Sequence, residues 1–179
     1  MKKLGFICLL ICLFGMKTSF SQNVKMPLDS ATKLITYSEV VNMTGTKDSL
    51  YQRALKWINT TYKNPNDVTK VRDLPNGKIE LIHRIKCTNT LKDGTKADGP
   101  TIQYTLTFNF KEGRYRYTFT KFNLKAASYF PLERWLNPKD PQYNVANDPY
   151  LTQLDTEVKE IIKSIKKGMV PPIVKKDNW

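Results

Sequence analysis

Histidine and cysteine, which often serve as catalytic groups and metal ligands, are nearly absent from this chain of 179 residues. There is one histidine, His83, and two of the three cysteines, Cys8 and Cys12, lie in the apolar stretch at the N-terminus. The remaining Cys87 cannot form an internal disulfide, and one cysteine with one histidine cannot build a cysteine-rich metal site. We therefore expect Cys87 to be a buried free thiol, with no metal and no cofactor in the protein.

Long apolar runs are missing as well. The longest, over residues 4–14, is shorter than the roughly 20 residues that a membrane span needs, and Lys17 ends any extension of it. It follows two lysines and precedes small residues up to Ser21, a pattern typical of a cleavable secretory signal. We expect cleavage after Ser21 and export to the periplasm or the medium. An uncleaved anchor would need a longer run, and neither N-terminal cysteine follows the small residue that lipid attachment requires.

Acidic residues are few, at 16 against 29 lysines and arginines, which gives a net charge of +13. Removal of residues 1–21 takes away three lysines and no acid, so the remaining chain keeps 26 basic and 16 acidic residues and a net charge of +10. A chain of that length buries roughly 68–70 % of its unfolded surface and needs no covalent staples. We expect one domain over residues 22–168, followed by a basic, proline-containing tail at 169–179.

Hydrophobic periodicity predicts both strands and helices. A spacing of three to four residues indicates two amphipathic helices over residues 47–62 and 150–167, with Thr46 as the N-cap of the first and Gly168 ending the second. Alternation and β-branched or aromatic content predict five strands at residues 34–43, 68–73, 78–88, 101–111 and 114–124. Residues 89–100 are expected to form a polar loop, and 125–148 an ordered loop with a helical turn at 132–136 that covers a sheet edge.

This order of elements favours an α+β fold, a two-layer sandwich of a five-stranded, mainly antiparallel sheet with two helices on one face. The helices cover the apolar side of the sheet, so its other side is left open. Alternation places these residues on the open face: Lys78, Glu80, Arg84, Lys86, Gln103, Thr105, Thr107, Asn109, Arg114, Arg116, Thr118 and Thr120.

Several motifs resemble a known family. They are GTKDSLYQRALKW at residues 45–57, then Tyr62, Asp73, Gly77 and Lys78, and EGRYRY at 112–117. They are similar to a secreted family of unknown function, found mostly in Bacteroidetes-type bacteria, that has a TATA-box-binding-protein-like fold. The resemblance covers about residues 28–122. It implies that fold and an export route, and it brings no assigned activity and no catalytic residues.

The sequence offers little for an enzyme. Alternation places His83 on the covered face, where a general base would not reach a substrate. There is no phosphate-binding glycine loop and no Gly-x-Ser-x-Gly motif. We therefore expect no catalytic activity. The alternative is an envelope hydrolase or transferase, which a concave pocket holding two close carboxylates would reveal.

A binding module is the function that we expect instead. The candidate ligand-binding residues are Arg84, Lys86, Gln103, Thr105, Thr107, Arg114, Arg116 and Thr118. Such a face suits an anionic or hydroxyl-rich partner, for example a glycan, a lipopolysaccharide headgroup or a peptide strand. Charged rows on a sheet are also often simply solvated. Nucleic acid is less favoured, because minor-groove binding by such a sheet uses apolar wedges that this face lacks.

Overall fold

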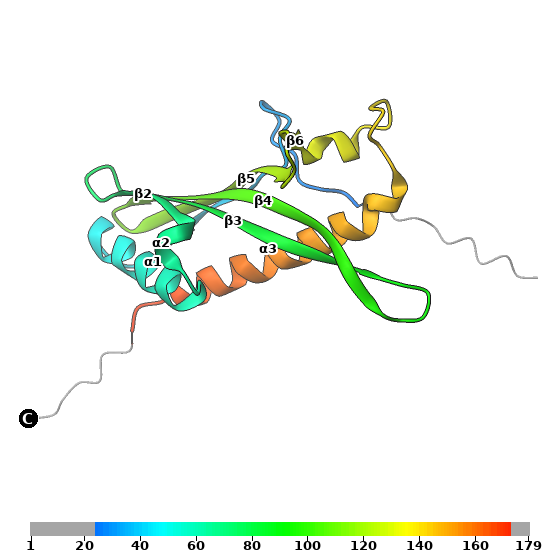
Figure 1. The fold of residues 1–179 in the computed structure, drawn as a ribbon. Coiled ribbons are helices and arrows are strands. Elements are labelled where there is room, and N and C mark those ends of the chain that lie inside the picture. The colour runs from blue at the N-terminus through cyan, green and yellow to red at the C-terminus, as the bar shows by residue number, and fades with distance from the viewer. Residues whose placement is uncertain (1–23, 173–179) are drawn as a thin grey trace, which may run out of the picture.

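The computed structural model describes residues 24–172, so the expected signal segment 1–21 and the end of the tail at 173–179 lie outside the described part. An antiparallel sheet forms one layer, and two long helices, α1 and α3, cover one of its faces (Figure 1). The expected α+β two-layer arrangement is confirmed.

The sheet has six strands, in the order β1-β5-β4-β3-β2, with a short β6 pairing with β5 beside β1. All of these pairings are antiparallel. The elements are β1 Tyr37–Asn42, α1 Lys47–Thr61, α2 Pro65–Val68, β2 Thr69–Asp73, β3 Lys78–Thr90, β4 Lys96–Lys111, β5 Arg114–Leu124, β6 Phe130–Pro131, η1 Leu132–Leu136, η2 Val145–Asn147 and α3 Asp148–Gly168. The five expected strands and both long helices are present, while β6 and α2 were not predicted because each is shorter than a periodic pattern.

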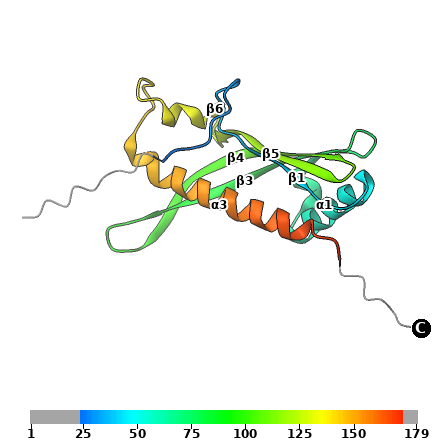
Figure 2. The same ribbon diagram turned by 180° about the vertical axis from the view of Figure 1, so that it is seen from behind.

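The predicted loop at residues 89–100 is wrong. β3 continues to Thr90 and β4 begins at Lys96, so that the two strands form a long hairpin that extends past the rest of the sheet (Figures 1 and 2). The register shifts near Gly99, where an added Cβ would lie 2.9 Å from the carbonyl oxygen of Cys87. The glycine that looked like a loop signal is therefore needed for close contact between strands at a bulge.

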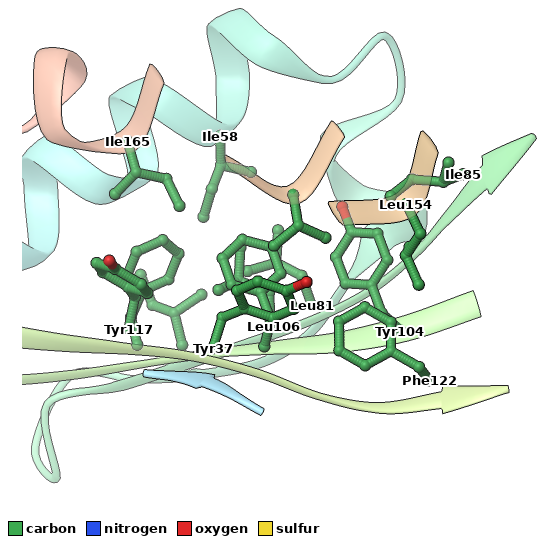
Figure 3. Packing of buried hydrophobic residues seen from close by; sticks show 14 of the residues in the cluster. Tyr37, Ile58, Leu81, Ile85, Tyr104, Leu106, Tyr117, Phe122, Leu154 and Ile165 are labelled. Carbon is green, nitrogen blue, oxygen red and sulfur yellow. The ribbon is translucent and has the colours of Figure 1, made fainter. Parts of the chain in front are cut away.

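The helices contribute apolar side chains to the core. Thr46 caps α1 as expected, because its Oγ1 accepts a hydrogen bond from the Ser49 N–H at 3.1 Å. The buried residues of the two helices are Leu50, Tyr51, Ala54, Trp57 and Ile58 of α1 and Leu151, Leu154, Val158 and Ile165 of α3. In Figure 3, Ile58 and Ile165 face strand residues that include Leu106 and Tyr117. The apolar stripes thus cover the sheet as their spacing predicts.

The 125–148 segment covers the edge of β5 beyond the end of β1. β6 pairs with Asn123 and Leu124, and Leu132 and Trp135 of η1 are buried in the core. Glu133 ties this segment to the chain before β1, because its Oε1 accepts the Ile35 N–H at 2.8 Å. The helical turn expected at 132–136 is present as η1, a 3₁₀ helix.

Gly168 is the last residue of α3, yet it does not end the helix through a left-handed backbone. The residue that follows it, Met169, keeps a right-handed φ of −81°. A Cβ on Gly168 would instead lie 2.6 Å from Cδ1 of Trp57, a rigid indole that cannot swing aside. The glycine is therefore needed for close packing between α3 and α1.

Gly168→Ala is expected to lower the free energy of unfolding by about 1–3 kcal/mol, because the new methyl group overpacks the contact with Trp57. Urea unfolding followed by circular dichroism measures the change. Lys167→Ala alters the neighbouring exposed position and serves as the control, with a change within about 0.5 kcal/mol. Equal stability of Gly168→Ala and the unmodified protein would contradict the packing role of this glycine.

Candidate functional site

The open face of the sheet carries cross-strand rows of polar side chains. The register places Ser38, Thr118, Thr107 and Glu80 in one row, and Val40, Arg116, Asn109 and Lys78 in the next. Side chains that lie opposite one another in neighbouring antiparallel strands are about 4.5–5.5 Å apart at Cβ. The structure therefore brings residues from four strands, distant in sequence, onto one surface.

The eight candidate residues all lie on this face, but their exposure differs. Four of them, Arg84, Lys86, Arg114 and Arg116, are exposed, whereas Gln103, Thr107 and Thr118 are half-buried. Thr105 is only 8 % exposed, so its expected availability to a ligand is wrong. Its short side chain lies in the central strand β4 between its register partners Ile82 and Thr120, which shield it.

Hydroxyl groups in the middle of the face bind one another. Ser38 Oγ and Thr118 Oγ1 lie 2.9 Å apart, and Thr36 Oγ1 and Thr120 Oγ1 lie 3.4 Å apart. These contacts join β1, and the residue just before it, to β5. The central hydroxyls thus contribute to the sheet's own hydrogen bonding, and the charged ends of the face hold most of its capacity to bind a ligand.

The cations divide between the two ends of the face. Lys78 belongs to the same cross-strand row as Arg116, with Asn109 between them. Arg84 lies six residues further along β3, so the two ends are about 20 Å apart. At the Arg84 end, Lys86 Nζ pairs with Asp98 at 2.7 Å, and Arg84 Nε donates to Gln103 Oε1 at 3.4 Å. The candidate residues therefore do not form a single cluster.

At the other end lies a groove of about 300 Å³ that we call the basic groove. Its lining residues are Val40, Asn109, Lys111, Arg114, Tyr115 and Arg116. None of its three cations forms an ion pair with a carboxylate of the described residues. Arg116 Nη2 donates to Asn109 Oδ1 at 3.4 Å. Three positive charges thus face solvent around one hollow.

Sequence reasoning did not place three lining residues of the basic groove, Val40, Lys111 and Tyr115, on the open face. Lys111 continues the alternation of Asn109 along β4, so the pattern could have revealed it. Val40, which is 56 % exposed, comes from β1, and its place beside Arg116 depends on a pairing between the first strand and the fifth. That long-range pairing has no local signal in the sequence.

The chemistry of the basic groove suits an anionic group attached to a less polar body. Guanidinium groups bind phosphate and carboxylate oxygens with two parallel hydrogen bonds, and a lysine adds a point charge. The Asn109 amide can bind a hydroxyl group, and Val40 offers apolar contact area. A phosphorylated or carboxylated sugar combines these features.

Comparison with known proteins places the fold in a family. The model of a domain of unknown function (DUF4468) with a TBP-like fold matches residues 37–125, which include β1 to β5 and α1. The chain belongs to the DUF4468 family. No curated protein matches the chain. The family description carries no activity, so the expected TBP-like fold is confirmed and the function is left open.

Two solved structures share the DUF4468 fold. A DUF4468 family protein of Bacteroides ovatus has a TM-score of 0.65 at 12 % identity, over 84 % of this chain and 93 % of that one. A TBP-like protein of Parabacteroides distasonis has a TM-score of 0.61 at 12 % identity, over 80 % of this chain and 96 % of that one. At such identity the likeness concerns the fold alone. Among residues 24–172, no helix has the length and hydropathy that a membrane span requires.

His83 of this DUF4468 domain lies on the helix-covered face, between aromatic rings. Its ring centroid is 4.7 Å from that of Tyr62 and 6.1 Å from that of Tyr104. Burial among these rings, together with the charge of the adjacent Arg84, lowers the pKa of His83 below its usual value. The histidine is therefore neutral in the folded protein at neutral pH, and its packing agrees with the expected structural role.

The depressed pKa of His83 predicts a loss of stability in mild acid. Above about pH 6.5 the histidine is neutral in both states, but below that value the unfolded chain binds a proton first. The free energy of unfolding should therefore fall as the pH drops from 7.5 to 5.5, and it should fall less steeply in His83→Gln. Urea unfolding at each pH measures both slopes, and parallel slopes would contradict a depressed pKa.

Glu39 is the carboxylate most closely bound within the sheet. Lys166 Nζ of α3 lies 2.8 Å from its Oε2, and Tyr117 Oη donates to the same oxygen at 2.5 Å. These contacts, the lysine's first, lower the pKa of Glu39, so the group stays ionised and ties β1 and β5 to α3. The ion pair with Lys166 and the hydrogen bond from Tyr117 therefore give Glu39 a structural role.

Cys87 is buried, as expected, with 1 % of its surface exposed. Burial raises the pKa of its thiol to about 11, and the charge of Glu157 acts in the same direction. The protonated thiol is a poor nucleophile at neutral pH. In the described residues, no group of three or more histidine, cysteine, aspartate or glutamate side chains could hold a metal ion.

Proposed function

We propose that this DUF4468 protein is an exported, non-catalytic binding module whose basic groove holds an anionic component of the cell envelope. The observation that carries the proposal is the convergence of Lys111, Arg114 and Arg116 on one hollow without a carboxylate partner among the described residues. Lysines and arginines whose only role is to keep a surface hydrated do not need to lie around one groove. Their convergence on a groove therefore favours a binding site.

The ligand class that best fits is a phosphorylated sugar headgroup. Two arginines can each bind a phosphate through two hydrogen bonds, while Asn109 and Val40 can contact a sugar ring. The signal-like segment at residues 1–21 supports an envelope location, where such headgroups occur. A DNA backbone fits less well, because minor-groove proteins insert large apolar wedges. The apolar or aromatic residues that line the basic groove are Val40 and Tyr115, and Tyr115 is buried.

The alternative considered above, a hydrolase or transferase with a carboxylate site, would need a cavity with paired carboxylates. Five of the cavities formed by the described residues each contain one carboxyl group at most, namely Asp148, Asp67 or Glu157. This arrangement supports the non-catalytic role, since general acid and base catalysis of glycoside cleavage needs two carboxyl groups across one site.

Calorimetric titration with a glucosamine disaccharide that carries two phosphates tests the proposal. We expect saturable binding that weakens with added salt, and at least tenfold weaker binding of the same disaccharide without phosphates. The neutral sugar is the matched control for contacts that do not involve charge. Equal affinity for the two sugars, or no binding of either, would overturn the proposed ligand class.

A further inference from the structure

β3 has one edge that lacks a neighbouring strand. β4 pairs with β3 from Lys78 to Thr90, whereas β2 pairs with the other edge only as far as Leu81. From Ile82 onward, the described residues provide no strand on that side, and Figure 1 shows the hairpin continuing past the end of β2. A strand edge of this kind presents backbone groups that can pair with another chain.

The direction of the backbone groups along this edge follows from two contacts. The carbonyl oxygen of Cys87 faces Gly99 of β4, while both backbone groups of Thr88 bind the side chain of Gln153 in α3. Because N–H and C=O groups alternate between the two edges of an antiparallel strand, Ile82, Arg84 and Lys86 turn theirs outward like Thr88. Three pairs of backbone groups therefore lie along the free edge between β2 and Gln153.

Gln153 shows that the edge has the geometry for pairing. Its Oε1 accepts from the Thr88 N–H at 2.9 Å, and its Nε2 donates to the Thr88 carbonyl at 2.8 Å. An added β-strand makes the same two hydrogen bonds with an outward-facing residue. The side-chain amide thus occupies one position of a ladder whose preceding positions are open.

Two hollows flank the open positions. One, of about 330 Å³, is lined by Tyr62, Lys63, Asn64, Asp67, Val68, Lys70, Ile82, His83 and Arg84. The other, of about 270 Å³, is lined by Ile85, Lys86, Thr88, Thr152, Gln153, Thr156 and Glu157. Together they provide room for side chains beside the edge, with four cations against two carboxylates.

We propose that the free edge of β3 binds an extended acidic peptide segment by strand addition. The segment would pair with Ile82, Arg84 and Lys86, along the nine residues from Glu80 to Thr88, a length of about 26 Å. Residues of the peptide on the open side of the sheet would lie beside Arg84, which has no ion pair with a described residue. Residues on the other side would face the helix layer, so acidic and apolar side chains should alternate.

Charge argues for such a peptide and against a second copy of this chain. Two copies that paired through the same edge would bring Arg84 and Lys86 of one against those of the other, and like charges in cross-strand positions are destabilising. The chain after residue 21 also carries a net charge of +10, which adds to the repulsion.

Fluorescence anisotropy with a labelled seven-residue peptide of alternating valine and glutamate tests the proposal on the purified full chain. We expect saturable binding, at least tenfold weaker for the same peptide with lysine in place of glutamate or with alternate backbone amides N-methylated. Hydrogen exchange should slow at the amides of Ile82, Arg84 and Lys86 when the peptide is bound. Unchanged binding of the N-methylated peptide, or formation of a dimer through this edge, would overturn the proposal.

Two charge reversals separate this edge from the basic groove. Arg84→Glu should weaken the acidic peptide at least tenfold, whereas Arg114→Glu, at the far end of the open face, should leave it unchanged. The bisphosphorylated disaccharide should show the opposite pattern. If Arg114→Glu lost peptide binding and Arg84→Glu kept it, the peptide would be assigned to the basic groove, and the proposal for the β3 edge would be wrong.

Discussion

Trp57→Ala is expected to lower the free energy of unfolding by about 3–5 kcal/mol, since it removes a large buried side chain from the junction of both helices and the sheet. The indole ring lies edge-on to Phe108 of β4, with 5.9 Å between centroids, and its Nε1 donates to Ser164 Oγ of α3 at 3.0 Å. Gly168 rests on the same ring.

Urea unfolding followed by circular dichroism and by tyrosine fluorescence measures this loss. Trp57→Phe keeps most of the apolar contact but gives up the hydrogen bond to Ser164, so a smaller loss of about 1–2 kcal/mol is expected. The double variant Trp57→Phe with Gly168→Ala should recover part of the cost of Gly168→Ala alone, because the smaller ring leaves room for the methyl group. Purely additive effects of the two changes would contradict direct contact between these residues.

Arg114→Glu combined with Arg116→Glu is expected to weaken the bisphosphorylated disaccharide about 100-fold. A pair of unit charges 4 Å apart in water contributes about 1 kcal/mol, and the double reversal turns two attractions into two repulsions, reduced by salt. Neither arginine forms an ion pair with a described residue, so the fold should keep its stability to within about 1 kcal/mol.

The matched control is Lys163→Glu combined with Lys167→Glu. These exposed lysines lie on α3, in the layer across the sheet from the basic groove, and the double reversal changes the net charge by the same amount. Calorimetry on both double variants separates a local site from a general attraction between a basic protein and an anion. A similar loss in the two variants would mean that net charge alone accounts for binding.

The sequence predicts the layers of this fold well because each element carries its own periodic signal. The alternation from Ile102 to Phe110 correctly predicts which side of β4 packs against the helices. The apolar stripe from Leu151 to Ile165 correctly predicts which side of α3 packs against the sheet. The hairpin between β3 and β4 was predicted too short, because Gly94 and Gly99 look alike in sequence. Gly94 makes a turn at a φ of 86°, whereas Gly99 allows contact between strands.

The site depends on contacts between residues distant in sequence, which a local pattern does not contain. Arg114 and Arg116 were predicted on the open face from alternation alone, but their separation from Arg84 follows from the register of three strands. The shielding of Thr105 and the place of Val40 depend on that register too. Gln153 reads as an ordinary solvent-facing helix residue, and only the path of α3 along β3 brings it to Thr88.

The most direct test of the central claim is a titration of the isotope-labelled protein with the bisphosphorylated disaccharide, followed by amide chemical shifts. The basic groove predicts saturating shifts at Val40, Asn109, Lys111, Arg114 and Arg116, and small ones on α1 and α3. Shifts spread evenly over the exposed lysines of both layers, or centred on the helices, would contradict a binding site on the open face of the sheet.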